Sequence, residues 1–206
     1  PLIGHAIERK LAKGEVLFLA GDPPRGLWVI VDGAVRAFRV GADGREQIIH
    51  VERAGATVGE VPMFDGGNCP SNAAAEQDSS LLFIPREDVQ RALLENPRIG
   101  LAALKVLARR IRACANLVET LSLHDVDRRL ARLLLGEAKA RGIQGGRGME
   151  IEFGLTHQQV ASRIGSVREV VSRAFGRLQQ AGLVRVEGAK VLILDFQTFQ
   201  AYAEGE

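Results

Sequence analysis

The 206-residue chain is poor in cysteine and has no long apolar run. Its two cysteines, Cys69 and Cys114, stand far apart and outside any C-x-x-C pair, so the sequence indicates neither a zinc site nor a disulfide framework. No apolar stretch reaches the roughly 18 residues that a membrane-spanning helix needs, and no basic-apolar leader is recognisable. We therefore expect a cytoplasmic protein with no membrane partner and no metal site.

Signatures of catalysis are missing as well. The sequence contains no P-loop, no G-x-S-x-G elbow, no H-E-x-x-H pair and no dinucleotide fingerprint after a strand. Its four histidines are scattered and predict no convergent site. We expect the protein not to be an enzyme.

Charge is distributed unevenly along the chain. Residues 1–96 hold 10 Lys/Arg and 14 Asp/Glu, a balance of −4, whereas residues 97–206 hold 17 and 11, a balance of +6. A basic half is the usual footprint of a part that binds a polyanion, although a solvated charged face gives the same count.

Residues 1–96 consist of short β-like runs separated by glycine-containing turns. Asp32-Gly33 and Asp43-Gly44 each lie between two such runs, which favours hairpins. The spacing predicts an all-β sandwich or barrel. The runs are Val16–Leu19, Leu27–Val31, Ala34–Val40, Gln47–Val51 and Leu81–Ile84.

Residues 97–124 predict one long helix, with Asn96 as its cap and Pro97 at its first position. Apolar residues recur along it at alternating steps of three and four, which is typical of a coiled-coil seam. Because this stripe is narrow and its flanks are charged, we expect it to pair two copies of the chain rather than to pack on the β domain. The seam residues are Leu104, Leu107, Ile111, Cys114, Val118 and Leu121.

Residues 125–206 predict a small helical domain that ends in a hairpin. Asp125 opens a helix, and a glycine-rich loop follows from Gly142 to Gly148. Residues 182–194 then predict two strands around a turn, which is the pattern of a wing.

Between the loop and the wing, two capping boxes predict two short helices. Thr156 with Gln159 begins the first helix, and Ser166 with Glu169 begins the second. Gly165 permits the positive φ of a tight turn between them. With a small residue four positions earlier, this spacing is typical of a DNA-binding helix-turn-helix.

The second of these helices carries Arg168, Glu169, Ser172 and Arg173 on the turns that enter the major groove. Arginine can bond guanine in bidentate fashion and glutamate can accept from cytosine, so we expect these residues to read bases. A structural alternative for Glu169 is capping and an i,i+4 pair with Arg173. The candidate phosphate contacts, which a solvated surface would also explain, are Thr156, His157, Gln158, Arg185 and Lys190.

The chain resembles the CRP/FNR family of bacterial transcription regulators over nearly its whole length, most specifically in Ser166–Arg173. The resemblance implies an α+β fold in three parts. A cyclic-nucleotide-binding-type β-roll (jelly roll) would span 1–96 as sensor, a dimerisation helix 97–124, and a winged helix-turn-helix 125–206.

The resemblance also implies a homodimer on pseudo-palindromic double-stranded DNA that contacts RNA polymerase, by position through Gln144–Glu150. Arg168 matches the CRP branch and Ser172 the FNR branch, so a half-site like TGTGA and one like TTGAT both stay open. An effector would then shift the long helix and reposition two recognition helices about 34 Å apart.

The family's cyclic-nucleotide cassette is incomplete. Gly59-Glu60 match it, but its arginine is replaced by Pro70, followed by Ser71-Asn72. Proline supplies neither charge nor N–H to a cyclic phosphate. Cys114 and Ala115 stand where the resemblance implies adenine-contacting hydroxyls, so we expect weak or no binding of cyclic AMP.

The input signal stays open. The N-terminal cysteine run of the iron–sulfur branch is absent, so we expect no cluster. Cys69 is a candidate redox sensor if its pKa is lowered. Nominal axial ligands for haem are the Pro1 amine, His5, His50, Met63 and Cys69.

Two other functions compete with a signal-sensing regulator. One is a constitutive dimeric DNA-binding protein whose β-roll is only a scaffold. The other is a cyclic-nucleotide-binding module without DNA function, such as a kinase regulatory subunit, which the missing arginine and the reading helix both oppose.

Overall fold

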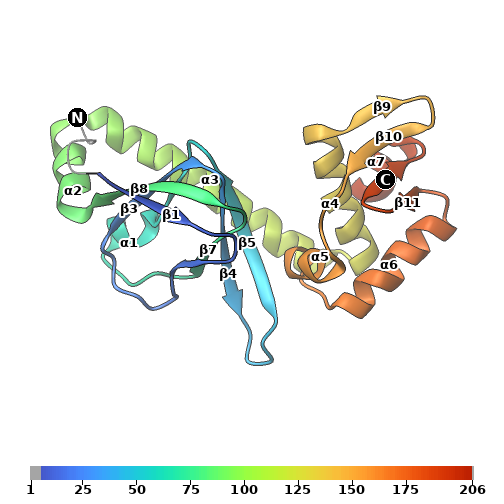
Figure 1. The fold of residues 1–206 in the computed structure, drawn as a ribbon, viewed down its shortest axis with the longest axis horizontal. Coiled ribbons are helices and arrows are strands. Elements are labelled where there is room, and N and C mark those ends of the chain that lie inside the picture. Colours follow the sequence, from blue (N-terminus) through green and yellow to red (C-terminus); the bar gives the residue numbers. More distant parts are fainter. Residues whose placement is uncertain (1–5, 206) are drawn as a thin grey trace. The chain divides into compact units, whose positions relative to one another are not determined.

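The computed structural model describes residues 6–205. Contacts divide it into two compact units (Figure 1). The first contains the residues up to 41 and residues 48–116, and the second contains residues 42–47 and the chain from 117 onward. Within residues 6–205, no helix has the length and apolarity to span a membrane.

The first unit is built on two four-stranded sheets with antiparallel pairing. One sheet contains, in spatial order, β1 (Ile7–Leu11), β8 (Ser79–Pro85), β3 (Gly26–Asp32) and β6 (Thr57–Val58). The other contains β2 (Val16–Phe18), β7 (Asn72–Ala75), β4 (Ala34–Val40) and β5 (Glu46–Arg53). Both sheets contribute to one apolar cluster, so they pack face to face as the sequence predicts. The cluster comprises Leu11, Leu17, Ile30, Val35, Val58, Ala73, Ala75 and Leu81.

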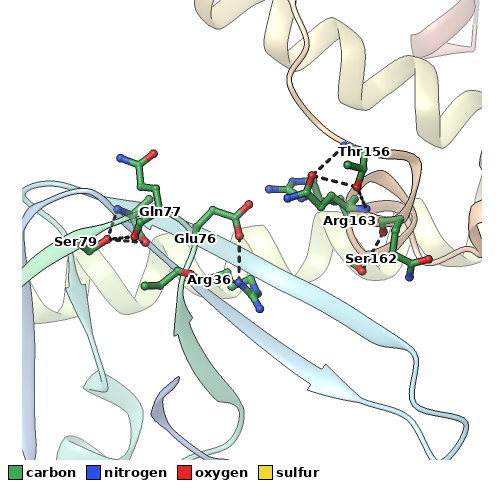
Figure 2. A network of polar contacts seen from close by, with 11 residues as sticks. Arg36, Glu76, Gln77, Ser79, Thr156, Ser162 and Arg163 are labelled. Carbon is green, nitrogen blue, oxygen red and sulfur yellow. Dashed lines mark hydrogen bonds and ion pairs between the residues drawn. The ribbon is translucent and has the colours of Figure 1, made fainter. Parts of the chain in front are cut away.

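Of the two expected hairpins, the one at Asp43-Gly44 is confirmed between β4 and β5, which are neighbours in one sheet. The one at Asp32-Gly33 is wrong, because this turn carries the chain from β3 in one sheet to β4 in the other. Gly33 has φ +88°, and a Cβ there would lie 2.2 Å from Ser79 Oγ, so only glycine fits. Ser79 Oγ in turn donates to the Gln77 carbonyl at 2.7 Å, and Arg36 on β4 pairs with Glu76 at 3.6 Å (Figure 2). These contacts fix the end of the roll at the β7–β8 connection.

Two short helices of the first unit, α1 (Glu60–Asp65) and α2 (Arg86–Glu95), are not expected from the sequence. The same holds for β1 and β7. Each is short, and α1 begins and ends at glycines with positive φ, Gly59 and Gly66. So little periodicity cannot distinguish a helix from a loop.

Helix α3 (Pro97–Leu123) is the long helix expected from the sequence, and Asn96 Oδ1 accepts from the Arg98 N–H at 3.1 Å at its start. None of its 27 residues, all within the described range, is buried. On the expected seam, Leu104, Ile111 and Val118 are 63%, 70% and 64% exposed. The helix therefore leaves most of its apolar stripe in solvent in the single chain.

The second unit packs helices against a four-stranded sheet ordered β11-β12-β10-β9. Its helices are α4 (Val126–Arg141), α5 (His157–Ile164), α6 (Arg168–Gln180) and α7 (Phe196–Glu204). Its strands are β9 (Ile143–Gly145), β10 (Gly148–Glu152), β11 (Val184–Glu187) and β12 (Lys190–Ile193). Asp125 caps α4 as expected, accepting from the Arg128 N–H at 2.8 Å.

Two expectations for this unit are wrong. The glycine-rich segment Gly142–Gly148 is not a loop, because most of it forms the β9–β10 hairpin. The chain also does not end in the wing, because α7 follows, capped by Asp195. Phe199 of α7 is fully buried, so this helix completes the core.

Candidate nucleic-acid interface and effector pocket

Helix α5 begins with the expected capping box. The Gln159 N–H donates to Thr156 Oγ1 at 3.2 Å, while Gln159 Oε1 accepts from the Thr156 N–H at 2.9 Å. Figure 2 shows Thr156 at this end of the helix, with Ser162 and Arg163 further along it. The two reciprocal bonds satisfy N–H groups that a helix start leaves without partners.

The α5–α6 turn closes on Gly165, at φ +64°. The N–H groups of Gly165 and Ser166 both donate to the Ala161 carbonyl, which ends α5. Arg129 of α4 donates from Nη1 to the carbonyls of Ile164 and Gly165 at 2.6 and 3.0 Å. Arg129, a residue that the sequence did not single out, therefore fixes this turn from a neighbouring helix.

The second capping box is not formed. Helix α6 begins at Arg168 with Val167 as its N-cap, and no side chain caps it. The backbone of Ser166 is already used to close α5, which explains why the expectation of a Ser166–Glu169 box is wrong. The alternative role for Glu169 as a capping residue is therefore wrong as well.

Helix α6 is amphipathic in the way a reading helix requires. Its inner face buries Val171, Ala174, Phe175 and Leu178 against Ala161 and other core residues of the unit. Burial of a branched or aromatic side chain contributes about 1.5–3 kcal/mol, so this face anchors the helix firmly. Ala161 is fully buried, so a larger side chain would separate the two helices.

The opposite face of α6 exposes all four residues expected to read bases: Arg168, Glu169, Ser172 and Arg173. Among residues 6–205, no hydrogen bond or ion pair engages their side chains, and the i,i+4 pair considered for Glu169 and Arg173 is absent. The structure thus brings four polar side chains together on one helix surface with no partner inside the described chain.

The expected phosphate contacts differ in whether their polar groups are already bonded within the chain, as the Thr156 hydroxyl is in the α5 capping box. Thr156 and Gln158 are exposed at the start of α5, and the His157 ring stacks on Phe175 with centroids 5.2 Å apart. In the wing, Lys190 Nζ lies 2.5 Å from Glu150 Oε1, and this hydrogen bond raises the pKa of Lys190.

Arg185, also in the wing, lies at a looser 3.9 Å from Glu187. Of the two basic wing residues, Lys190 is therefore the one that is hydrogen-bonded to a carboxylate within the chain.

The cassette residues Gly59 and Glu60 lie at the start of α1. Glu60 is only 7% exposed. Its Oε1 accepts from Thr57 Oγ1 at 2.5 Å and from Arg110 Nη2 at 3.3 Å. A buried carboxylate needs such a cation, and here α3 supplies it.

Arg110 is the centre of this cluster and was not a candidate from the sequence. Its Nη2 also donates to the Thr57 carbonyl at 3.0 Å, and its Nη1 bonds Glu52 and lies 3.3 Å from His50 Nδ1. Burial alone would raise the pKa of Glu52, but hydrogen bonds from His50 and Arg110 together lower it. The partners are 50–60 residues apart in sequence, so no local pattern could reveal them.

The remaining cassette positions carry no cation for a phosphate. Pro70 is exposed and its carbonyl accepts from Arg39 Nη1 at 2.7 Å. Ser71 is buried, and Asn72 Oδ1 accepts from the Ala20 N–H at 2.9 Å.

The two α3 positions of the expected effector pocket, Cys114 and Ala115, are exposed. Within residues 6–205, no polar interaction joins either of them to Glu60 or Ser71.

Of the nominal haem ligands, Pro1 and His5 lie outside the described residues. His50 belongs to the Arg110 cluster, and Met63 and Cys69 are buried. Burial and the nearby Asp22 raise the pKa of Cys69, the opposite of what a redox sensor needs. No group of three metal-binding side chains occurs within residues 6–205.

Comparison with known proteins identifies both parts of the chain. A family model of the cyclic nucleotide-binding domain matches residues 8–96, and one of the Crp-like helix-turn-helix domain matches residues 128–202. The CRP-like cAMP-activated global transcriptional regulator of Mycobacterium tuberculosis is 32% identical over 89% of this chain and 82% of its own length.

The global nitrogen regulator of Synechococcus elongatus is 30% identical over 89% of this chain and 83% of its own length. The solved structure of the c-di-GMP responsive global regulator CLP from Xanthomonas campestris has a TM-score of 0.81 at 24% identity, covering 92% of this chain and 94% of that one, which shows the same fold. The order of β-roll, long helix and helix-turn-helix and the identity to these regulators agree: the chain belongs to the CRP/FNR family of transcription regulators.

Proposed function

We propose that the protein is a homodimeric regulator that binds a specific pseudo-palindromic DNA site. The observation that carries the proposal is the outer face of α6, where Arg168, Glu169, Ser172 and Arg173 are exposed and have no partner within residues 6–205. Charged groups held on a rigid helix without internal partners are available for base edges.

In this proposal each exposed residue has a defined role. Arg168 and Arg173 bond guanine in the major groove, Glu169 accepts from cytosine N4, and Ser172 bonds an adjacent base. The half-site resembles TGTGA or TTGAT. Phosphate contacts come from Thr156, His157, Gln158 and Arg185, with Lys190 contributing less because Glu150 already neutralises it.

Two further surfaces complete the proposal. The exposed stripe of α3 pairs with the same stripe of a second copy, which removes Leu104, Ile111 and Val118 from water. The β9–β10 hairpin, residues 144–150, contacts RNA polymerase. A signal in the β-roll acts through α3, because the Arg110 cluster ties that helix to the roll.

The test begins with selection of genomic fragments bound by the purified protein, followed by affinity measurements on the selected site. Arg168→Ala and Arg173→Ala should each weaken specific binding by about 1–3 kcal/mol and relax the choice at a G·C position. Arg141→Ala, which removes an exposed arginine paired with Glu137 on α4, is the control and should change little. An equal loss on every sequence would assign Arg168 and Arg173 to phosphates and defeat the base-reading proposal.

A constitutive regulator is the second candidate, and the Arg110 cluster favours it. Glu52, Glu60 and the Thr57 carbonyl already satisfy the guanidinium, so the pocket is neutralised without an effector. The measurement is the absorbance spectrum and mass of the undenatured protein, then its DNA affinity with and without cyclic AMP. High affinity in protein free of any small molecule supports this candidate, and a bound chromophore or ligand contradicts it.

A further inference from the structure

An ion pair joins α6, the helix proposed to read bases, to the start of α4. Its partners are Asp127, in the first turn of α4, and Arg177 of α6. Arg177 Nε lies 2.5 Å from Asp127 Oδ2, and Arg177 Nη2 lies 2.5 Å from Asp127 Oδ1. This is the two-pronged arrangement in which guanidinium and carboxylate planes align, so it fixes orientation as well as distance. The hydrogen bond with Asp127 raises the pKa of Arg177.

The place of Arg177 on α6 gives the pair its significance. Arg177 lies one helical turn after Arg173, so it follows the base-reading face toward the end of the helix. An arginine there, if free, would add a cation that attracts any phosphate backbone, whatever the sequence. Asp127, with a side chain only 18% exposed, neutralises that cation.

The pair also acts on the seating of α6. The apolar contacts of its buried face fix the distance of α6 from the core of the unit. The two hydrogen bonds between Arg177 and Asp127 join the third turn of α6 to the start of α4. Arg129, two residues further along α4, holds the α5–α6 turn. The beginning of α4 thus contacts the helix-turn-helix at two separate points.

We propose that Asp127 and Arg177 are positioning residues for sequence reading. The pair keeps α6 at the orientation in which Arg168, Glu169 and Arg173 meet base edges, and it withholds Arg177 from non-specific phosphate binding. Both effects raise the ratio of specific to non-specific affinity. The inference rests on the proposed function, because it deepens the role of the same helix.

The experiment measures the dissociation constants of the full-length protein for its selected site and for a shuffled duplex of equal length. In Asp127→Asn the specific site should bind about two- to fivefold more weakly, a range typical of a well-formed surface ion pair. The shuffled duplex should bind more tightly, and its binding should depend more steeply on salt by about one ion, because Arg177 is released.

Arg177→Gln separates the two effects. It should weaken specific binding to a similar degree but should not tighten shuffled-duplex binding or steepen its salt dependence, because it releases no cation and leaves Asp127 uncompensated. The reversed pair, Asp127→Arg with Arg177→Asp, should recover at least half of the lost ratio, which a simple loss of charge would not do. Glu204→Gln is the matched control, because it breaks the Lys139–Glu204 pair of the same unit at 3.1 Å.

The possible outcomes test the positioning role separately from the proposed function. A wild-type protein that binds the selected and shuffled duplexes equally overturns the proposed function. A wild-type protein that discriminates, together with an Asp127→Asn variant of unchanged ratio, overturns only the positioning role. If Glu204→Gln lowers the ratio of specific to non-specific affinity as much as Asp127→Asn does, the positioning role is also overturned, since any ion pair of the unit would then have the same effect.

Discussion

The outer face of α6 and the cassette around Glu60 both carry charge, but they use it in opposite ways. On α6, Arg168 and Arg173 point to solvent with no partner within residues 6–205. In the cassette, Glu60 is buried and bonded to Arg110, which also bonds Glu52. In the proposed function the unpaired charge on α6 is available to DNA, whereas the paired charge around Glu60 holds α3 against the roll.

The stripe on α3 extends this comparison to apolar groups and gives the largest expected effect on DNA binding. Ile111→Glu places a charge in the exposed seam and should abolish pairing of two copies. Loss of the second DNA contact should then weaken binding to the full site about 100-fold. Molar mass by light scattering and affinity for the full site are the measurements.

The control for this change is Asn116→Glu, which adds the same charge to an exposed position of α3 off the seam. It should leave both mass and affinity unchanged. A wild-type chain that is monomeric at all concentrations would show that the open stripe has another use.

The second prediction compares the two regions directly through stability. Arg110→Met leaves Glu52 and Glu60 without their cation and should lower the free energy of unfolding by roughly 3 kcal/mol. Arg173→Met removes an unpaired surface cation and should change it by less than about 0.5 kcal/mol. Urea denaturation measures both changes. Equal losses of unfolding free energy would show that the buried ion pairs of Arg110 stabilise the fold no more than the unpaired Arg173 does.

The third prediction concerns ligand binding by the cassette. Pro70→Arg restores a cation at the position where the family's phosphate-binding arginine is missing. A charge-assisted hydrogen bond of this kind should raise the affinity for cyclic AMP about tenfold, as measured by calorimetry. Asn68→Arg, in the same exposed loop, is the control, and an equal gain there would mean only non-specific attraction.

The smallest effect concerns pH. The pKa of Glu52 is lowered in the folded chain, so its contribution to stability is present above the unfolded value, about 4.3, and is lost as pH falls through the folded value. Glu52→Gln should therefore be less stable than wild type at pH 7, and the gap should narrow below about pH 4. A gap independent of pH would contradict an ionised Glu52.

The sequence is sufficient for the parts of the fold that depend on local signals. Asn96 and Pro97 mark the start of the long helix, and Thr156 with Gln159 marks the start of α5, because caps act within four residues. The exposure of Arg168 and Arg173 follows from helical periodicity once the turn at Gly165 is recognised.

The rest depends on contacts between distant residues. The Arg110 cluster joins side chains 50–60 residues apart, and Asp127 meets Arg177 across 50 residues. The β9–β10 hairpin forms in a glycine-rich segment because β12 provides a neighbouring strand for β10. Ser166 matches a cap pattern locally, but its N–H donates to the Ala161 carbonyl of α5, and Val167 is the N-cap of α6 instead.

Trp28 is the single tryptophan of the chain and lies on β3 in the first unit, tilted against Phe83 with ring centroids 4.7 Å apart. Fluorescence excited at the red edge of its absorption therefore reports on the β-roll alone and is blind to the helix-turn-helix. Far-ultraviolet circular dichroism, which is dominated by helices, reports on both units, because α4 to α7 lie in the second and α1, α2 and most of α3 in the first. Superimposing the two melting traces would tell whether the units unfold as one cooperative body or in succession.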